Sequence, residues 1–201
     1  MRLPSESKQQ LFLKSLLPEN PVLHSGLGVM LAVAGTETSS QAFFLGSAAL
    51  ALILLTSLVS ALAYELLQKR TPLWLLVALA SLAIALGRRL FGGRLDELPP
   101  MTGILLYLLA VSPVIFARAR GMTASTTVGR ALFDAAGTGT GLVAVLACLG
   151  LARELLSRGT AGSAGPLFQP PAPWMGTMLG GFVSCAAAIA LFRLARERSG
   201  P

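Results

Sequence analysis

The sequence has few of the residues that carry most soluble catalytic and metal chemistry. Its 201 residues include one histidine and two cysteines, and only 12% of them are charged. Two cysteines give neither a disulfide framework nor a zinc-binding spacing. No G-x-S-x-G, Walker or His/Cys/Glu metal-cluster pattern occurs. These absences argue against a hydrolase, a nucleotide-binding enzyme and a zinc protein.

The low charge content also separates this chain from soluble domains, in which about 25% of residues are charged. Hydrophobic residues make up 54% of the chain, and its mean hydropathy is +0.70. The net charge of +7 does not indicate a nucleic-acid partner, because the basic residues lie between apolar runs and no RNA or DNA motif accompanies them. The polar N-terminus has no apolar core ending at a cleavage site, so we expect no cleaved signal peptide. The composition predicts an all-α integral membrane protein whose main surroundings are the lipid bilayer.

Six apolar segments are candidates for crossing the membrane. A regular helical span needs about 20 residues. The second, fifth and sixth segments meet this length, and the third does so if Arg88 and Arg89 extend their side chains to the headgroups. The six segments are Pro21–Gly35, Ala42–Leu67, Leu73–Phe91, Met101–Phe116, Ala131–Leu156 and Trp174–Leu194.

The first and fourth segments are short and interrupted. The first carries Gly26 and Gly28, and the fourth carries Ser112 and Pro113. A backbone that breaks inside the hydrocarbon must be buried against protein. Interrupted segments at matching places in two halves are typical of inverted-repeat membrane proteins with a site at the midplane. Ordinary short helices in a thin bilayer are the alternative.

The two halves of the chain, residues 20–92 and 101–194, resemble each other. The second segment ends Tyr64-Glu65-Leu66-Leu67 and the fifth ends Arg153-Glu154-Leu155-Leu156, both after runs of small residues. Three spans in each half predict an inverted three-plus-three repeat, although chance similarity between apolar stretches is an alternative. Eleven of the sixteen Lys and Arg residues then fall on the side of both termini. The positive-inside rule therefore predicts a cytoplasmic N-terminal segment (1–19), one membrane domain (20–194) and a cytoplasmic tail (195–201).

Polar groups inside the fifth segment form a candidate ion or proton path. Asp134 lies about one turn inside this segment, beside Thr138 and Thr140, and a carboxylate within a membrane span is a functional candidate by default. The alternative is an interfacial acid that is stabilised by the helix dipole and pairs with Arg130. The glycines of the G-x-G-x-G run that follows are expected to allow close helix contact, and no strand precedes them as a nucleotide-binding loop requires.

These residues resemble the membrane subunits of Rnf-type and Na⁺-translocating NADH:quinone oxidoreductase (Nqr) complexes, most closely the RnfE/RsxE/NqrD branch. The resemblance covers about residues 11–194 and is carried by gapless runs rather than by one decisive motif. Four stretches align with motifs of the family: Glu19–Leu23 with N-N-P-x-L, Leu27–Leu31 with L-G-L-C-P, Gly103–Leu105 with G-I-F, and Ala110–Ile115 with V-T-N-C-I-V. Single residues and pairs match as well, with the spacing of the family: Arg118-Ala119, Asp134, Gly139, Gly141, Arg153-Glu154 and Gly159-Thr160.

In that family each of the two half-helices presents one cysteine at midmembrane, and two such subunits together hold a [2Fe–2S] cluster. The corresponding positions here are Met30 and Pro113, and neither a thioether nor a proline replaces a thiolate ligand. We therefore expect Met30 to be a plain core residue. Cys148 and Cys185 fall in the fifth and sixth segments, where we expect them to pack as small apolar residues. The resemblance therefore implies a divergent subunit that keeps the scaffold and binds no cofactor itself.

The resemblance implies a subunit of a complex in the bacterial inner membrane that couples electron flow from ferredoxin or NADH carriers to Na⁺ or H⁺ movement. It also implies a paralogous, inverted partner subunit of the RnfA/NqrE type, and flavins in other subunits. The chain is not expected to be an enzyme by itself. Two alternatives remain open at this point: a small transporter or vitamin-uptake component with its substrate at the broken helices, and an assembly or anchoring protein.

Overall fold

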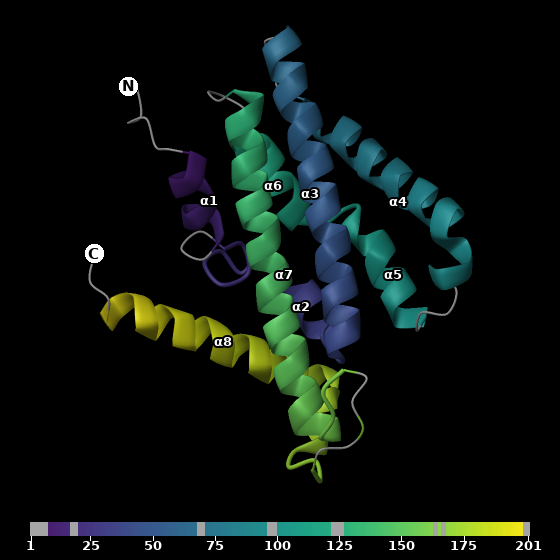
Figure 1. The fold of residues 1–201 in the computed structure, drawn as a ribbon, viewed down its shortest axis with the longest axis vertical. Coiled ribbons are helices and arrows are strands. Elements are labelled where there is room, and N and C mark those ends of the chain that lie inside the picture. The colour runs from purple at the N-terminus through teal and green to yellow at the C-terminus, as the bar shows by residue number, and fades with distance from the viewer. Residues whose placement is uncertain are drawn as a thin grey trace.

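The computed structural model describes residues 8–16, 20–67, 71–95, 100–121, 127–162, 165 and 168–198. Within these ranges the chain is helical and contains no strand, as the sequence predicts (Figure 1). The helices are α1 (Lys8–Leu16), α2 (Val29–Ala34), α3 (Ser39–Leu67), α4 (Leu73–Leu95), α5 (Pro100–Leu109), α6 (Pro113–Gly121), α7 (Val128–Arg158), the 3₁₀ turn η1 (Pro173–Gly176) and α8 (Met178–Arg198).

Two long antiparallel helices, α3 and α7, form the centre of the molecule (Figure 1). Glycines let their backbones approach closely. A Cβ at Gly46 of α3 would lie 3.1 Å from the Cα of Val143, and a Cβ at Gly150 of α7 would lie 2.6 Å from the Cβ of Ala42. With 31 residues at about 1.5 Å each, α7 is about 46 Å long, which exceeds the roughly 30 Å of bilayer hydrocarbon.

The short helix α1 packs along α7 rather than standing apart from it. A Cβ at Gly137 would lie 2.5 Å from the carbonyl oxygen of Phe12, and a Cβ at Gly141 would collide with that of Leu16. The glycines of the G-x-G-x-G run therefore do permit close helix contact, as expected. Residues 1–7 and 17–19 of the predicted N-terminal segment, and 199–201 of the predicted tail, lie outside the described residues.

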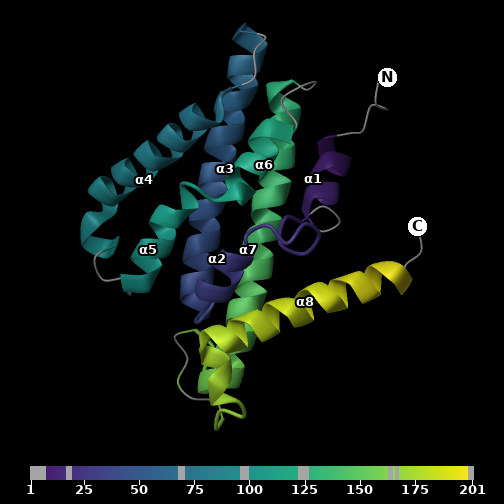
Figure 2. The same ribbon diagram turned by 180° about the vertical axis from the view of Figure 1, so that it is seen from behind.

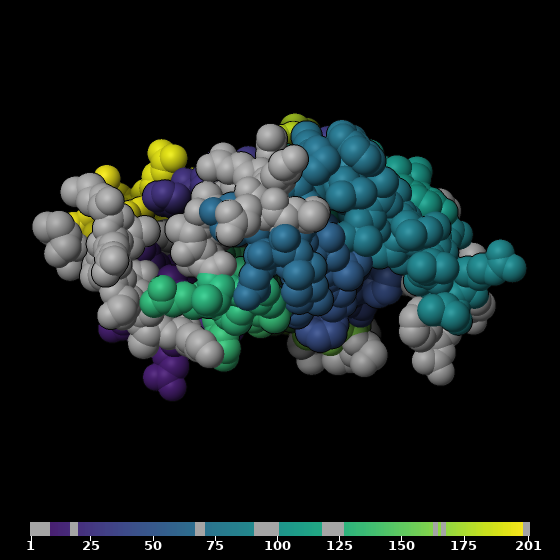
Figure 3. Space-filling view, turned by 90° about the horizontal axis from the view of Figure 1, so that it is seen from above, coloured from purple at the N-terminus to yellow at the C-terminus, as the bar shows by residue number. Residues whose placement is uncertain are grey.

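Four further helices lie on two sides of the α3–α7 pair. Helices α4 and α5 lie on one side, whereas α1 and α8 lie on the other, and α8 leaves the pair at a steep angle (Figures 1 and 2). The view from above shows the same division (Figure 3). Only 17% of the apolar stretch is buried in α4 and in α8, against 44% in α3 and 50% in α7. The outer helices therefore expose broad apolar faces such as a bilayer or a neighbouring subunit would cover.

Within the described residues, four helices are long and apolar enough to cross a membrane: α3, α4, α7 and α8. They correspond to the second, third, fifth and sixth predicted segments. The sixth begins differently from the prediction, because η1 and α8 are separate elements that meet at Thr177, which has extended backbone angles. The first segment consists of turns followed by α2, and the fourth is divided between α5 and α6.

Candidate functional site

The first break is a turn built by Asn20, Gly26 and Gly28. The buried Asn20 carboxamide oxygen accepts hydrogen bonds from the backbone N–H groups of Val22 and Leu23, at 3.0 and 3.4 Å, which is a local side-chain turn. Gly26 and Gly28 have φ values of +65° and +84°, in the left-handed region that favours glycine. Helix α2 begins directly after Gly28.

The second break separates α5 from α6. The N–H groups of Ala110, Val111 and Ser112 each bond to the carbonyl three residues earlier, at 3.0–3.2 Å, so the end of α5 tightens into a 3₁₀-like turn. Pro113 then opens α6. Proline suits this position because its missing N–H has no partner in the first turn of a helix.

The two breaks are in direct contact. A Cβ at Gly28 would lie 2.7 Å from Cγ2 of Val114, the residue after Pro113. Val22, Val114 and Ile115 are all buried in the shared core. Only a residue without a side chain fits at Gly28, because it combines a left-handed backbone with this close approach.

A hollow of about 360 Å³ lies between the two breaks. Its walls come from the turn before α2, from α2 itself and from the α5–α6 junction. The lining residues are Gly26, Leu27, Gly28, Val29, Met30, Leu31, Leu105, Leu108, Val111, Ser112 and Pro113. The structure thus brings together Met30 and Pro113, the two positions that the resemblance aligns with cluster ligands, together with all the residues expected at the breaks.

The chemistry of this hollow does not fit an iron–sulfur cluster. Among the described residues that line it there is no thiol, carboxylate or imidazole, and Ser112 has the only hydroxyl. A cluster needs thiolates or, in some types, imidazoles. Met30 is 70% exposed, so it is not the core residue that the sequence predicts, and its thioether does not replace a thiolate. Cys148 and Cys185 do not line the hollow: Cys148 is exposed on α7, and Cys185 is buried on α8.

Arg153, near the end of α7, carries the densest polar network of the described residues. It is 1% exposed. Its guanidinium donates to the carbonyl of Val33 (2.8 Å) and the hydroxyl of Thr36 (2.7 Å). It also donates to the carbonyls of Met175 (3.1 Å) and Thr177 (2.9 Å). One side chain therefore joins the end of α2 to the start of α8.

Glu154, the next residue, joins the end of α7 to the start of α3. The N–H and hydroxyl of Ser39, the first residue of α3, both donate to Oε2 of Glu154 at 2.7 Å, and the hydroxyl of Thr160 donates to Oε1 at 3.1 Å. A carboxylate at a helix N-terminus satisfies free N–H groups and complements the dipole. In the sequence Arg153 counted as a charge for membrane orientation, as part of the similarity between the halves and as part of the family resemblance, but not as a structural contact. The signal that it does more was an Arg-Glu pair inside an otherwise apolar helix.

The three residues of the candidate ion path do not all lie on one face of α7. Asp134 is 2% exposed and accepts a hydrogen bond from the hydroxyl of Ser15 on α1. Thr138, one turn further, is fully buried, and its hydroxyl has no hydrogen-bond partner among the described residues. Thr140 is only half-buried and bonds to its own helix at the carbonyls of Ala136 and Gly137. Asp134 and Thr138 therefore share a helix face, but Thr140 lies on another.

Comparison with known proteins places this arrangement in a family. Residues 8–194 match the family described as "Rnf-Nqr subunit, membrane protein". The chain is 31% identical over 147 residues to the E component of the ion-translocating oxidoreductase complex of Shewanella amazonensis, covering 73% of this chain and 63% of that protein. It is 34% identical over 158 residues to the protein of the same name from Edwardsiella ictaluri, covering 78% and 66%.

A more distant relative is the E component of the proton-translocating ferredoxin:NAD(+) oxidoreductase complex of Clostridium ljungdahlii, which is 26% identical over 149 residues, or 74% of this chain and 70% of that protein. The chain thus spans somewhat less than two thirds of the length of the first two relatives. Because the family match covers nearly the whole described fold, this chain belongs to the Rnf-Nqr family of membrane subunits.

Proposed function

We propose that this chain is an integral membrane subunit of an ion-translocating electron transport complex of the Rnf/Nqr type. The family match and the names of the relatives support this proposal. The four long apolar helices are suited to a protein that lies within a membrane. Family membership favours this function over the small transporter and over the anchoring protein that the sequence left open. The electron donor, the acceptor and the ion moved belong to the whole complex.

Within that complex the chain is proposed to act as a scaffold that lacks the ligands for a midmembrane [2Fe–2S] cluster. The observation that carries this proposal is the hollow between the breaks, where Met30 and Pro113 stand at the positions that the resemblance aligns with the cluster ligands, and where none of the described lining residues has a thiol. No electron step is assigned to this chain. Flavins and clusters would reside in other subunits.

A paralogous, inverted subunit of the RnfA/NqrE type is the proposed partner at this hollow. The lining is almost wholly apolar, and its residues Met30 and Val111 are exposed, so a second protein surface could pack against them within the bilayer. The same order of a short helix before two long ones, α2–α3–α4 and α6–α7–α8, supports an inverted repeat with six crossings. The proposed location is the bacterial inner membrane, with both termini in the cytoplasm.

An ion path along Asp134 and Thr138 remains part of the proposal, with Thr140 less favourably placed. Two buried groups on one face of α7 support it: the Asp134 carboxylate, and the Thr138 hydroxyl, which has no hydrogen-bond partner among the described residues. Replacing Asp134 with Asn would keep the side-chain volume and remove the charge. Ion uptake by vesicles containing the complex is expected to fall, whereas assembly is unchanged. Equal uptake by wild type and variant would remove Asp134 from the path.

Co-purification tests the main proposal. An affinity tag after Pro201 allows gentle solubilisation of the membranes and identification of the bound proteins by mass spectrometry, with untagged cells as the control. Recovery of flavin- and iron–sulfur-containing subunits of an Rnf-like complex is expected. Recovery of the chain alone and colourless, under conditions in which the chain remains folded, would contradict the subunit function.

A further inference from the structure

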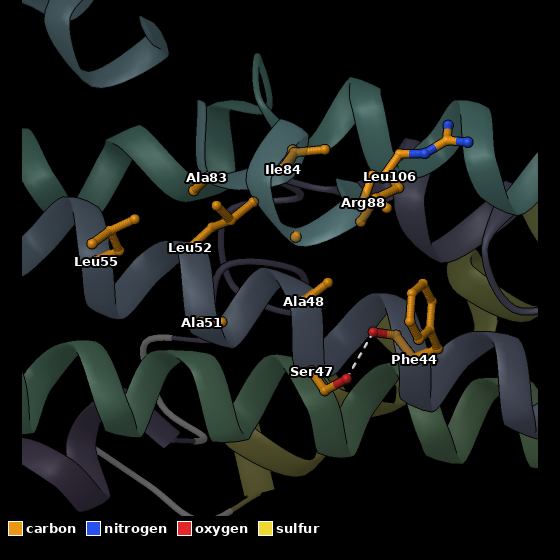
Figure 4. Close-up of a pocket in the computed structure, with 11 residues that line it drawn as sticks. Phe44, Ser47, Ala48, Ala51, Leu52, Leu55, Ala83, Ile84, Arg88 and Leu106 are labelled. Atoms are coloured by element: carbon orange, nitrogen blue, oxygen red, sulfur yellow. Dashed lines mark hydrogen bonds between the residues drawn. The ribbon is translucent and has the colours of Figure 1, made fainter. Parts of the chain in front are cut away.

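A second hollow, apart from the breaks, opens between α3, α4 and α5. Its volume is about 460 Å³ (Figure 4). Its floor is the face of α3 that runs from Phe44 to Leu55, and Ala83, Ile84 and Leu106 lie across from it. Ser47 is the one neutral polar side chain in this lining, and its hydroxyl donates to the carbonyl of Phe44 at 2.8 Å. The groove therefore presents an apolar wall along its length.

The groove has the length of one lipid chain. Phe44 and Leu55 are separated by eleven residues of helix, or about 16 Å at about 1.5 Å per residue. One leaflet contributes about half of the roughly 30 Å of bilayer hydrocarbon. An extended acyl chain that lies along α3 would thus fill the groove within the thickness of its own leaflet.

A positive charge lies at one end of this apolar groove. Figure 4 shows Arg88 of α4 at the Phe44 end, away from Leu55. The guanidinium carbon of Arg88 lies 5.1 Å from the centre of the Tyr107 ring on α5, and Nη1 donates to the Tyr107 hydroxyl. These contacts hold the guanidinium beside the groove. Arginine binds phosphate through charge-assisted, often paired hydrogen bonds.

We propose that this groove binds one anionic phospholipid, with an acyl chain along α3 from Leu55 to Phe44 and the phosphate at Arg88. The length and the apolar wall of the groove match an acyl chain, and the positive charge at one end matches the phosphate. A net negative headgroup is favoured over a zwitterionic one because Arg89, exposed on the next position of α4, adds to the local positive charge. The bound lipid would fill the space between α3 and α4 and hold these helices in their observed relation.

Native mass spectrometry of the detergent-purified protein, isolated in whatever assembly it forms, tests this proposal. Phosphatidylglycerol is added, and phosphatidylcholine is added in a parallel sample. One retained phosphatidylglycerol per chain is expected, with little retained phosphatidylcholine. Arg88→Gln is expected to reduce retention roughly tenfold, as for the loss of one hydrogen bond to a charged group. Arg89→Gln removes the same charge from a side chain that does not line the groove, and a much smaller loss is expected.

A second variant separates lipid binding from the role of Arg88 in folding. Ala48→Phe fills the middle of the groove and leaves both arginines in place, so it is expected to abolish retention without removing a charge. Equal losses in the Arg88 and Arg89 variants, or full retention in the Ala48 variant, would overturn the proposal. So would a photo-crosslinker at Ala51 that captures another polypeptide in native membranes, because the groove would then be a protein interface. These outcomes do not depend on which complex the chain joins.

Discussion

The hollow between the two breaks and the Arg153–Glu154 network, at opposite ends of α2, differ sharply in chemistry. The hollow is lined by apolar side chains and backbone, and has one hydroxyl among its described lining residues. The network places a buried guanidinium and a buried carboxylate in contact with α2, α3 and α8. Polar contacts thus position α2, α3 and α8, whereas the described residues that line the hollow include no thiol or imidazole. The groups that fix these helices lie apart from the place where the two breaks meet.

Arg153→Met is expected to produce the largest effect. Methionine keeps the apolar part of the side chain but leaves the buried carbonyl of Val33 without the guanidinium donor, and it also removes the hydrogen bonds to Thr36, Met175 and Thr177. A buried acceptor left without a partner costs about 1–3 kcal/mol and each further hydrogen bond contributes about 1 kcal/mol, so we expect a loss of several kcal/mol in stability, although the Thr177 carbonyl keeps the N–H of Gly181. The measurement is thermal unfolding in detergent together with the amount of protein in the membrane. Arg158→Gln, at the exposed end of the same helix, serves as the control, and an equal loss in both variants would contradict the assigned role.

Gly28→Ala tests whether the first break depends on direct contact with the second. The new methyl group would meet Val114, and the left-handed backbone adds strain, so a loss of about 2–4 kcal/mol is expected. Gly26→Ala imposes a similar backbone strain with no atom within 4 Å, and is expected to cost about 1–2 kcal/mol. Denaturation in detergent measures both. If the two variants lose equal stability, packing between the breaks does not contribute.

Glu154→Gln compares the two halves of the proposed repeat. Loss of the charge weakens the hydrogen bonds from the N–H and hydroxyl of Ser39, and a cost of about 1–2 kcal/mol is expected. Glu65 occupies the corresponding place in the first half but is exposed. Glu65→Gln is therefore expected to change stability by less than about 0.5 kcal/mol. A similar loss at both positions would show that the two glutamates have equal structural roles.

Met30→Leu is expected to have the smallest effect. Met30 is 70% exposed, and leucine preserves its size and polarity, so stability should change by less than about 0.5 kcal/mol. Recovery of partner subunits by the tagged variant should equal that of wild type. A specific loss of partners, with stability unchanged, would show that the sulfur of Met30 contributes to the interface.

Local backbone chemistry explains why the breaks could be predicted from the sequence. Glycine with positive φ at Gly26 and Gly28, and proline at the start of α6, act within a few residues of their own positions. The long helices could be predicted from the sequence equally well, because a sustained apolar run is a local property. The beginning of the sixth segment was missed because Thr177 separates η1 from α8 inside a stretch that is apolar throughout.

Contacts between distant residues account for what the sequence did not reveal. Arg153 binds groups that lie 117–120 residues earlier and 22–24 residues later in the chain, and no local pattern encodes these pairs. The packing of α1 on α7, and with it the Ser15 partner of Asp134, is likewise a tertiary contact. The lack of cluster ligands could be inferred only from the resemblance, since it depends on knowing which two positions should carry thiolates.

The iron content of the purified complex shows whether this chain helps to hold a cluster. Iron and acid-labile sulfide are measured per complex, beside the visible and electron paramagnetic resonance spectra, for wild type and for Met30→Leu and Pro113→Ala. We expect the same iron and the same spectra in all three, with every cluster assigned to cysteines of other subunits. The loss of a [2Fe–2S] signal and about two irons per complex in either variant, with assembly unchanged, would show that these residues support a cluster.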